Sequence, residues 1–339
     1  MSDATDSEVV VVTGASAGVG RATARTFADR GAKVGLLARG EDGLEAARED
    51  VEQAGGEAVV VPTDVADPGA VADAAETVED AFGPIDVWVN NAMVSVFSPA
   101  AEMSADDYRR VTEVTYLGYV YGTQAALERM RPRDEGTIVQ VGSALAYRGI
   151  PLQSAYCGAK HAIQGFTESV RTELIHDDCD VQLSMVQMPA MNTPQFEWSK
   201  SRMSKEPQPV PPIYQPEVAA RAIRWAVDHD KDEFWVGRST VKAILGNRIM
   251  PRRLDTYLAR GGYDSQQTDE PIDPDRAHNL HEPVSSDFGA HGPFDDRARD
   301  RSYQLQASMH RRGLALLAGL VAAVLSVLLG RRAASTDAE

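Results

Sequence analysis

Short apolar segments rich in β-branched residues alternate along this chain with longer segments of helical periodicity, and this alternation limits its possible folds more than any other feature. Residues 8–13 form the first apolar segment, followed by a glycine-rich turn and an amphipathic helix through Val19 and Phe27. The remaining apolar segments are residues 33–38, 58–62, 85–90, 137–141, 181–186 and 233–236. Helical spacing is found at about residues 41–54, 69–82, 104–130, 154–176 and 216–229. Strands separated by such helices form a parallel sheet covered on both faces, so we expect an α/β fold with one doubly wound, seven-stranded parallel sheet.

The alternation ends near Gly262, where the composition changes. Residues 264–300 hold ten acidic side chains against three arginines, with several prolines and few aliphatic residues, which predicts an extended linker with little core of its own. Residues 313–330, GLALLAGLVAAVLSVLLG, then carry no charge and lie between two arginine pairs. As a helix they would span ~27 Å, close to the ~30 Å hydrocarbon core of a bilayer. We expect a main domain at residues 1–262, an acidic linker at 263–309, a transmembrane helix at 310–332 and a polar tail at 333–339.

The apolar run has two other interpretations, a buried helix and a helix that docks on a partner protein, but its position beyond the acidic segment favours a membrane span. The N-terminus shows no basic stretch followed by an apolar run, so we expect no signal peptide and a single-pass C-terminal anchor with the main domain in the cytoplasm. Two cysteines fit a reducing compartment and make no zinc site by themselves, so we expect no metal. A net charge of −16 argues against nucleic acid as a partner, because phosphate-backbone binders need clustered Lys and Arg.

The turn after the first apolar segment reads TGASAGVG, from Thr13 to Gly20. Glycines let the backbone approach a pyrophosphate closely, and the N-terminus of the following helix offers free N–H groups and the positive end of its dipole. A glycine-rich turn alone also serves tight packing, but its place between the first strand and the first helix favours a dinucleotide site. The residues expected to contact the cofactor here are Gly14, Ser16, Gly18, Val19 and Gly20.

Arg39 ends the second apolar segment, where a domain that prefers NAD usually carries an acid for the ribose 2′-hydroxyl. Its guanidinium can instead pair with a 2′-phosphate, which predicts NADP, with NAD possible. A solvated arginine at a strand end is the alternative. Asp64 and Val65 follow the third segment, and Asp64 could accept a hydrogen bond from the adenine amino group. The alternative role of Asp64 is to cap the helix that begins near Pro68.

Tyr156 and Lys160 stand four residues apart, on one face of a predicted helix. An ammonium group near a phenol favours the phenolate and brings the tyrosine pKa toward a useful range for proton transfer. Ser143, at the end of the fifth apolar segment, can hydrogen-bond a substrate carbonyl. Each residue alone is more often structural. Their joint occurrence after a cofactor turn predicts a proton donor, a group that tunes it and a group that orients the substrate.

Together these motifs resemble the short-chain dehydrogenase/reductase family from about residue 8 to residue 240. They are TGxxxGxG from Thr13 to Gly20, Asn90-Asn91-Ala92, Ser143, and YxxxK from Tyr156 to Lys160. The resemblance implies a Rossmann-type catalytic domain, NADP or NAD, hydride transfer between the nicotinamide C4 and a carbonyl or alcohol carbon, and a homo-oligomer. Tyr156 would be the general acid and base, and Lys160 would bind the nicotinamide ribose and lower the tyrosine pKa. Ser143 would hold the substrate oxygen, and Asn91 would lie near the adenosine side of the cofactor.

Three positions depart from the family pattern. Met93 replaces the glycine that usually follows Asn-Asn-Ala. Thr115 stands where the fourth catalytic residue is normally an asparagine that helps to hold a water. Threonine lacks the two amide donors, so we expect a slower or differently wired proton relay. The segment MPAMNT, residues 188–193, replaces PGxxxT, and Pro189 and Thr193 remain expected cofactor contacts.

Residues 193–215 occupy the usual lid position and contain Phe196, Trp198, Met203 and Tyr214. These side chains predict an apolar, bulky substrate or, alternatively, only cover the core. We expect a membrane-anchored, NADP(H)-preferring oxidoreductase that acts on a carbonyl or secondary alcohol of a hydrophobic small molecule. The alternatives are a catalytically inactive NADP(H)-sensing protein at the membrane and a soluble reductase whose tail docks on a partner.

Overall fold

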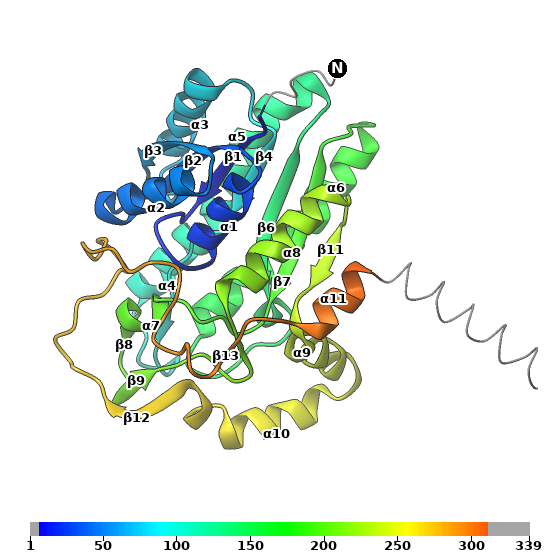
Figure 1. Cartoon of the computed structure of the whole chain (residues 1–339). Coiled ribbons are helices and arrows are strands. Elements are labelled where there is room, and N and C mark those ends of the chain that lie inside the picture. Colours follow the sequence, from blue (N-terminus) through cyan, green and yellow to red (C-terminus); the bar gives the residue numbers. More distant parts are fainter. Residues whose placement is uncertain (1–6, 311–339) are drawn as a thin grey trace, which may run out of the picture.

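The computed structural model describes residues 7–310 and has a seven-stranded sheet at its centre (Figure 1). The strand order is β11-β7-β6-β4-β1-β2-β3, and all neighbouring strands are parallel. The strands are β1 (Val9–Thr13), β2 (Lys33–Ala38), β3 (Glu57–Pro62), β4 (Val87–Asn90), β6 (Thr137–Ser143), β7 (Gln182–Met188) and β11 (Glu233–Trp235). The chain winds outward from β1 in both directions, so the predicted doubly wound α/β fold is confirmed.

Helices cover both faces of this sheet because the strands are apolar on both sides. Val10 and Val12 of β1 pack in one core cluster, whereas Val9 and Val11 pack in the other. The first cluster is completed by α1 (Gly18–Ala28), α2 (Glu41–Gln53) and α8 (Pro216–Asp228). The second is completed by α3 (Pro68–Phe82), α4 (Ala105–Thr112), α5 (Gly118–Met130) and α6 (Ser154–His176).

The helix predicted over residues 104–130 is interrupted. A capping box between Ser104 and Asp107 begins α4, and a π-helical turn at Glu113–Leu117 separates α4 from α5. This wider turn brings Thr115 against the loop that follows β4. There its hydroxyl accepts the Val94 N–H at 3.0 Å and donates to the Val94 carbonyl at 2.9 Å. The interruption therefore fixes the loop after β4, and single π turns of this kind are frequent at functional sites.

The chain after Gly262 differs from the predicted linker. It is mostly irregular, as expected, but it returns across the domain at the carboxyl ends of the strands; in Figure 1 it runs from yellow to orange past α7 (Gln195–Trp198). Two short strand pairs hold it. They are β12 (Gln267–Pro271) with β9 (Lys205–Pro207) and β13 (Ala298–Arg299) with β10 (Ile213–Tyr214).

Residues 279–295 of this segment, called the strap below, pack directly on the domain. Leu280, Ala290 and Phe294 are all buried, and Leu280 is 0 % exposed. Leu280 joins the second core cluster, and Phe294 packs in a small cluster with Phe196. The segment is held mainly by contacts with the domain instead of an apolar core of its own, which is why its acidic, aliphatic-poor composition predicted a linker.

The apolar run at residues 313–330 lies outside the described residues, so the membrane helix stays a prediction. Among the helices of residues 7–310, none combines the length and the apolar character that crossing a bilayer requires. The main domain was predicted to end at residue 262, which directly follows α10 (Pro251–Gly261). The final described helix, α11 (Tyr303–Met309), contacts α9 (Gly237–Ile249).

Candidate active site

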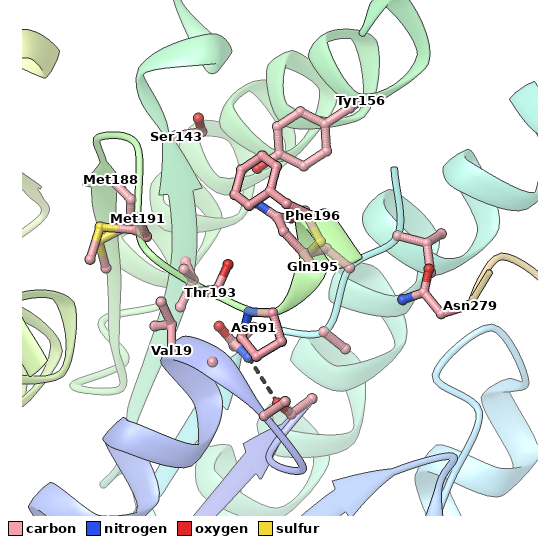
Figure 2. A pocket seen from close by; sticks show the side chains of 18 of the residues that line it. Val19, Asn91, Ser143, Tyr156, Met188, Met191, Thr193, Gln195, Phe196 and Asn279 are labelled. Atoms are coloured by element: carbon pink, nitrogen blue, oxygen red, sulfur yellow. Dashed lines mark hydrogen bonds between the residues drawn. The ribbon is translucent and has the colours of Figure 1, made fainter. Parts of the chain in front are cut away.

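A cavity of about 430 Å³ lies at the carboxyl ends of the strands, where α/β folds place their ligands. Figure 2 shows Ser143 and Tyr156 at one end of it, Val19 and Asn91 at another, and Asn279 of the strap at its side. Nearly all of the predicted site residues line it. They are Gly14, Ser16, Gly18, Val19, Arg39, Asp64, Val65, Asn91, Ser143, Tyr156, Lys160, Pro189 and Thr193.

The glycine-rich turn has the conformation that its sequence requires. Gly14 and Gly18 have φ angles of +66° and +58°, which favour glycine. A Cβ on Gly20 would come within 2.2 Å of the Gly14 carbonyl oxygen, so Gly20 serves the packing of α1 against the turn. Within residues 7–310 no side chain caps the N-terminus of α1, and its first turn holds no acid. The positive end of the helix dipole thus fits an anion such as a pyrophosphate.

Asn91 ties the loop after β4 to this turn. Its side-chain Nδ2 donates to the carbonyl oxygens of Thr13 and Gly14, at 2.9 and 3.3 Å. The Thr13 hydroxyl in turn accepts the backbone N–H groups of Asn91 and Ala92, at 2.9 and 3.0 Å. These bonds keep the loop in place although Met93 stands at the usual glycine position.

Arg39 reaches the cavity from the end of β2, where the strap holds its guanidinium. Nη1 donates to the His281 carbonyl at 2.6 Å, and Nη2 donates to the Asn279 carbonyl. Burial lowers the pKa of Arg39, and the nearby carboxylates of Asp64 and Glu282 offset this effect only in part. Neutral carbonyl groups therefore orient Arg39, the residue predicted to bind a 2′-phosphate.

Asp64 is engaged by other residues at the cavity wall. Its Oδ2 pairs with Arg110 at 2.5 Å, and its Oδ1 accepts the Ala66 N–H at 3.0 Å. The alternative role of Asp64 as a helix cap is wrong. Asp67 caps α3 instead, and its carboxylate accepts the Gly69 N–H at 2.8 Å.

Ser143, Tyr156 and Lys160 meet at one end of the cavity. Ser143 ends β6, and the other two residues lie one turn apart on α6. The Lys160 Nζ donates to the Val141 carbonyl at 2.7 Å and to the Tyr119 hydroxyl at 3.0 Å, and it lies 5.6 Å from the centroid of the Tyr156 ring. A phenol with a lysine amine beside it and a serine hydroxyl facing it can exchange a proton with a substrate oxygen.

The pKa values at this end differ from the sequence expectation. Burial raises the pKa of Tyr156, and a hydrogen bond with Ser143 lowers it only in part. Burial also lowers the pKa of Lys160 to about 7. Desolvation of both groups thus opposes the lowering of the tyrosine pKa that the sequence predicts from a nearby ammonium group.

Thr115 and Tyr119 lie one helical turn apart but have different roles. Thr115 is fully buried and its hydroxyl donates to the Val94 carbonyl, so it positions the loop after β4, and its place in a proton relay stays a prediction. Sequence reasoning missed Tyr119, which is 1 % exposed and donates its hydroxyl to the Val141 carbonyl at 3.0 Å. The lysine Nζ lies 4.6 Å from its ring centroid, which makes Tyr119 a positioning residue for Lys160.

The segment that replaces PGxxxT is held by the strap. Pro189 and Thr193 line the cavity, and Asn192 between them is 0 % exposed. The Asn192 Nδ2 donates to Asp295 Oδ1 at 2.8 Å, and its Oδ1 accepts the Phe294 N–H at 3.1 Å. The segment that departs from the family pattern is therefore held by hydrogen bonds to Phe294 and Asp295 of the strap.

The lid residues divide between the two interpretations of the sequence. Phe196 and Trp198 line the cavity, which favours a bulky apolar ligand. Met203 packs in the cluster around Phe196, and Tyr214 lies 2 % exposed in the sheet core, so these two cover the core.

Asp107 anchors the lid and was also missed. It is buried on α4, and its carboxylate pairs with Lys200 at 2.9 Å and with Arg202 at 2.6 Å. Although burial alone would raise its pKa, hydrogen bonds with Lys200, Ser104 and Arg202 hold the pKa of Asp107 well below the usual range. The sequence indicated the capping box in which Asp107 takes part, but it did not indicate the ion pairs of Asp107 with the lid.

The strap should loosen as the pH rises through the pKa of His291. His291 bonds Glu217 through Nε2 at 3.0 Å and Asp295 through Nδ1 at 2.9 Å. Burial would lower its pKa, but these bonds raise it above 6.5. Protonated His291 therefore stabilises the strap fully below about pH 6.5, and this stabilisation is lost as the pH rises through the raised pKa of His291. Hydrogen exchange of strap amides, corrected for intrinsic rates, should be slower at pH 6 than at pH 8.5. His291→Gln should remove the difference; an equal difference in that variant contradicts the assignment.

Comparison with known proteins agrees with this geometry. The family model described as "short chain dehydrogenase" matches residues 8–203, more than half of the chain. The chain is 34 % identical over 320 residues to "Uncharacterized oxidoreductase YxnA" of Bacillus subtilis (strain 168), a match that covers 93 % of this chain and 89 % of that protein. It is 37 % identical over 184 residues to "Dehydrogenase/reductase SDR family member 7B" of Rattus norvegicus, which covers 52 % of this chain and 56 % of the rat protein.

Solved structures show the same relationship. A short-chain dehydrogenase from Streptomyces avermitilis has a TM-score of 0.64 and 26 % identity, and the match covers 77 % of this chain and 99 % of that one. An alcohol dehydrogenase from the archaeon Thermococcus sibiricus, complexed with 5-hydroxy-NADP, has a TM-score of 0.59 and 29 % identity, with 68 % and 95 % covered. The chain therefore belongs to the short-chain dehydrogenase/reductase family and is an NAD(P)-dependent dehydrogenase or reductase.

Proposed function

We propose that this chain is an NADP(H)-preferring oxidoreductase that transfers hydride between the nicotinamide and a carbonyl or secondary alcohol of a hydrophobic small molecule. The observation that carries the proposal is that Ser143, Tyr156 and Lys160 line the same cavity as the glycine-rich turn and Arg39. A nicotinamide cofactor bound there supplies or accepts the hydride. The protein holds the substrate oxygen and moves one proton.

The proposed roles follow from the contacts at this end of the cavity. Ser143 hydrogen-bonds the substrate oxygen, and Tyr156 gives it a proton during reduction or takes the proton during oxidation. Lys160 lies beside Tyr156 and, when protonated, stabilises the phenolate that remains after the proton has left. The Val141 carbonyl and the Tyr119 hydroxyl hold the lysine Nζ in this place.

Arg39 supports the preference for NADP(H). It lies where an acid would favour NAD, and within residues 7–310 it hydrogen-bonds carbonyl groups and no carboxylate. A 2′-phosphate would supply the missing negative charge. A metagenomic short-chain oxidoreductase solved in complex with NADP matches this chain with a TM-score of 0.57 and 27 % identity, which is consistent with this preference.

Apolar side chains in the cavity wall support a hydrophobic substrate. Ile150, Met191, Phe196, Trp198 and Val210 all line the cavity. Sites of this kind take up apolar ligands and use a few polar groups to fix the orientation. In this cavity those polar groups are the hydroxyls of Ser143 and Tyr156.

Turnover with a panel of aldehydes, ketones and secondary alcohols tests the proposal. The full chain in detergent should oxidise NADPH faster than NADH with at least one hydrophobic carbonyl compound. Faster turnover with NADH would overturn the cofactor preference. Tight NADPH binding without turnover of any substrate would instead favour the alternative, a cofactor-sensing binding protein.

We further propose that residues 313–330 anchor the chain in a membrane, with the catalytic domain in the cytoplasm. Within residues 7–310, five of the seven exposed large apolar side chains gather on or beside α9 and α10: Leu245, Ile249, Met250, Tyr257 and Tyr263. The same stretch contains six basic residues: Arg238, Lys242, Arg248, Arg252, Arg253 and Arg260. A basic surface with exposed apolar residues suits an anionic bilayer, and α11, the last described helix, contacts α9.

Membrane fractionation of the full chain tests the anchor. Alkaline carbonate and high salt should leave the protein in the membrane pellet, and a double variant with Leu317→Arg and Val321→Arg should move to the supernatant. Release of the unchanged chain by high salt would contradict the span and would favour docking on a partner protein.

A further inference from the structure

The strap reaches the adenosine end of the proposed cofactor site through consecutive backbone carbonyls. Arg39 donates to the carbonyls of Asn279 and His281, and the Arg110 Nε donates to the Leu280 carbonyl at 3.0 Å. Leu280 itself is 0 % exposed and packs in the core. The strap is thus held by two arginines: Arg39, which follows β2, and Arg110, which pairs with Asp64.

The Asn279 side chain, at the wall of the cavity, has a buried acceptor that no described residue uses. Asn279 lines the cavity, and Figure 2 shows it across from Met188 and Met191. Its Oδ1 is buried and accepts no hydrogen bond from any residue in the described range 7–310. Its backbone is fixed, because its N–H donates to the Trp198 carbonyl at 2.9 Å. Leaving a buried acceptor without a partner costs free energy, so the position fits a ligand that brings a donor.

The rest of the strap is tied to the elements that surround the pyrophosphate turn. Asp287 forms an ion pair with Arg21 of α1, and the Gly18 N–H donates to the Gly289 carbonyl at 3.1 Å. The Phe288 ring packs edge-on against Trp198, with 4.4 Å between the ring centroids. These contacts hold the strap over the cavity from the first helix to the lid.

We propose that the strap completes the adenosine end of the cofactor site. The Asn279 Oδ1 accepts a hydrogen bond from the adenosine half of the cofactor, and the carbonyls of Asn279 and His281 orient Arg39 toward the 2′-phosphate without neutralising it. Neutral carbonyls can do this because they satisfy the guanidinium N–H groups and leave its charge for the phosphate. The inference rests on the proposed NADP(H) preference.

Calorimetric titration of the full chain with 2′,5′-ADP and with 5′-AMP tests the inference without any turnover. Asn279→Ala should weaken both probes by a similar factor, ~3- to 10-fold, because one hydrogen bond is lost. Asp287→Asn frees the strap from Arg21 and should weaken 2′,5′-ADP more than 5′-AMP, because Arg39 loses its orientation. Asp296→Asn is the control. It makes the same change of charge at an exposed residue just beyond the strap and should leave both affinities unchanged.

Each outcome decides between the two proposals. If the unchanged protein binds 2′,5′-ADP no better than 5′-AMP, the NADP(H) preference fails and the role given to the strap falls with it. If the unchanged protein prefers 2′,5′-ADP but Asn279→Ala and Asp287→Asn bind like the control, only the strap inference is overturned. Tighter binding by Asp287→Asn would also overturn it, because the strap would then compete with the cofactor.

Discussion

Replacement of Tyr156 by phenylalanine should reduce turnover ~10²- to 10⁴-fold, the range expected when a general acid and base is removed. The ring, and with it the packing of α6, is retained, so the loss reports on the hydroxyl alone. NADPH affinity should change little, because the proposed task of this hydroxyl is to move the substrate proton. Steady-state rates on the best substrate of the panel, together with a separate NADPH titration, provide the measurement.

Tyr147→Phe is the matched control for this substitution. Tyr147 lies four residues after Ser143, and its hydroxyl donates to Glu233. Removing that hydroxyl should leave turnover nearly unchanged. Equal losses in the two variants, or full activity in Tyr156→Phe, would show that the proton does not pass through Tyr156.

Replacement of Arg39 by alanine should weaken NADPH binding by ~10- to 100-fold and should leave NADH binding nearly unchanged. Hydrogen bonds to a charged group contribute ~1.5–3 kcal/mol, and only NADPH carries the 2′-phosphate that Arg39 would bind. Arg39→Asp should go further and favour NADH, because a carboxylate repels the phosphate and accepts the ribose 2′-hydroxyl. Dissociation constants of both cofactors for each variant are the measurement.

Arg48→Ala is the control for loss of a positive charge near this site. Arg48 lies exposed on α2, where it pairs with Glu45 and Glu52. It should bind both cofactors like the unchanged protein, since exposed ion pairs contribute little. Equal weakening of NADPH and NADH in Arg39→Ala would mean that Arg39 supports the fold of the site and does not select the cofactor.

The sheet and most of the cavity lining could be predicted because local patterns determine them. The burial of Val9 to Val12 on alternating faces of the sheet and the positive φ angles of Gly14 and Gly18 are properties of short segments. The π turn at Glu113–Leu117 could not be predicted, since its residues read as one continuous helix. The partner of Lys160 was missed for another reason: Tyr119 approaches it only after α5 and α6 have packed.

The strap shows a further limit of the sequence. Carbonyl groups hold Arg39, and any residue type supplies a carbonyl, so no side-chain pattern marks Asn279 or His281 as its partners. Asp64 and Asp67 show the same limit at short range. Both are acidic residues before a helix, and only the backbone geometry decides that Asp67 is the cap and that Asp64 pairs with Arg110.

Transfer of deuterium from NADPH that carries deuterium at both C4 positions to a product carbon tests the central claim most directly. The full chain is incubated with the labelled cofactor and the carbonyl panel, and the alcohols formed are examined by mass spectrometry. The proposed function predicts one deuterium on the carbinol carbon of at least one hydrophobic product, and a strongly reduced yield with Tyr156→Phe. Bound NADPH that passes no deuterium to any member of the panel would contradict it.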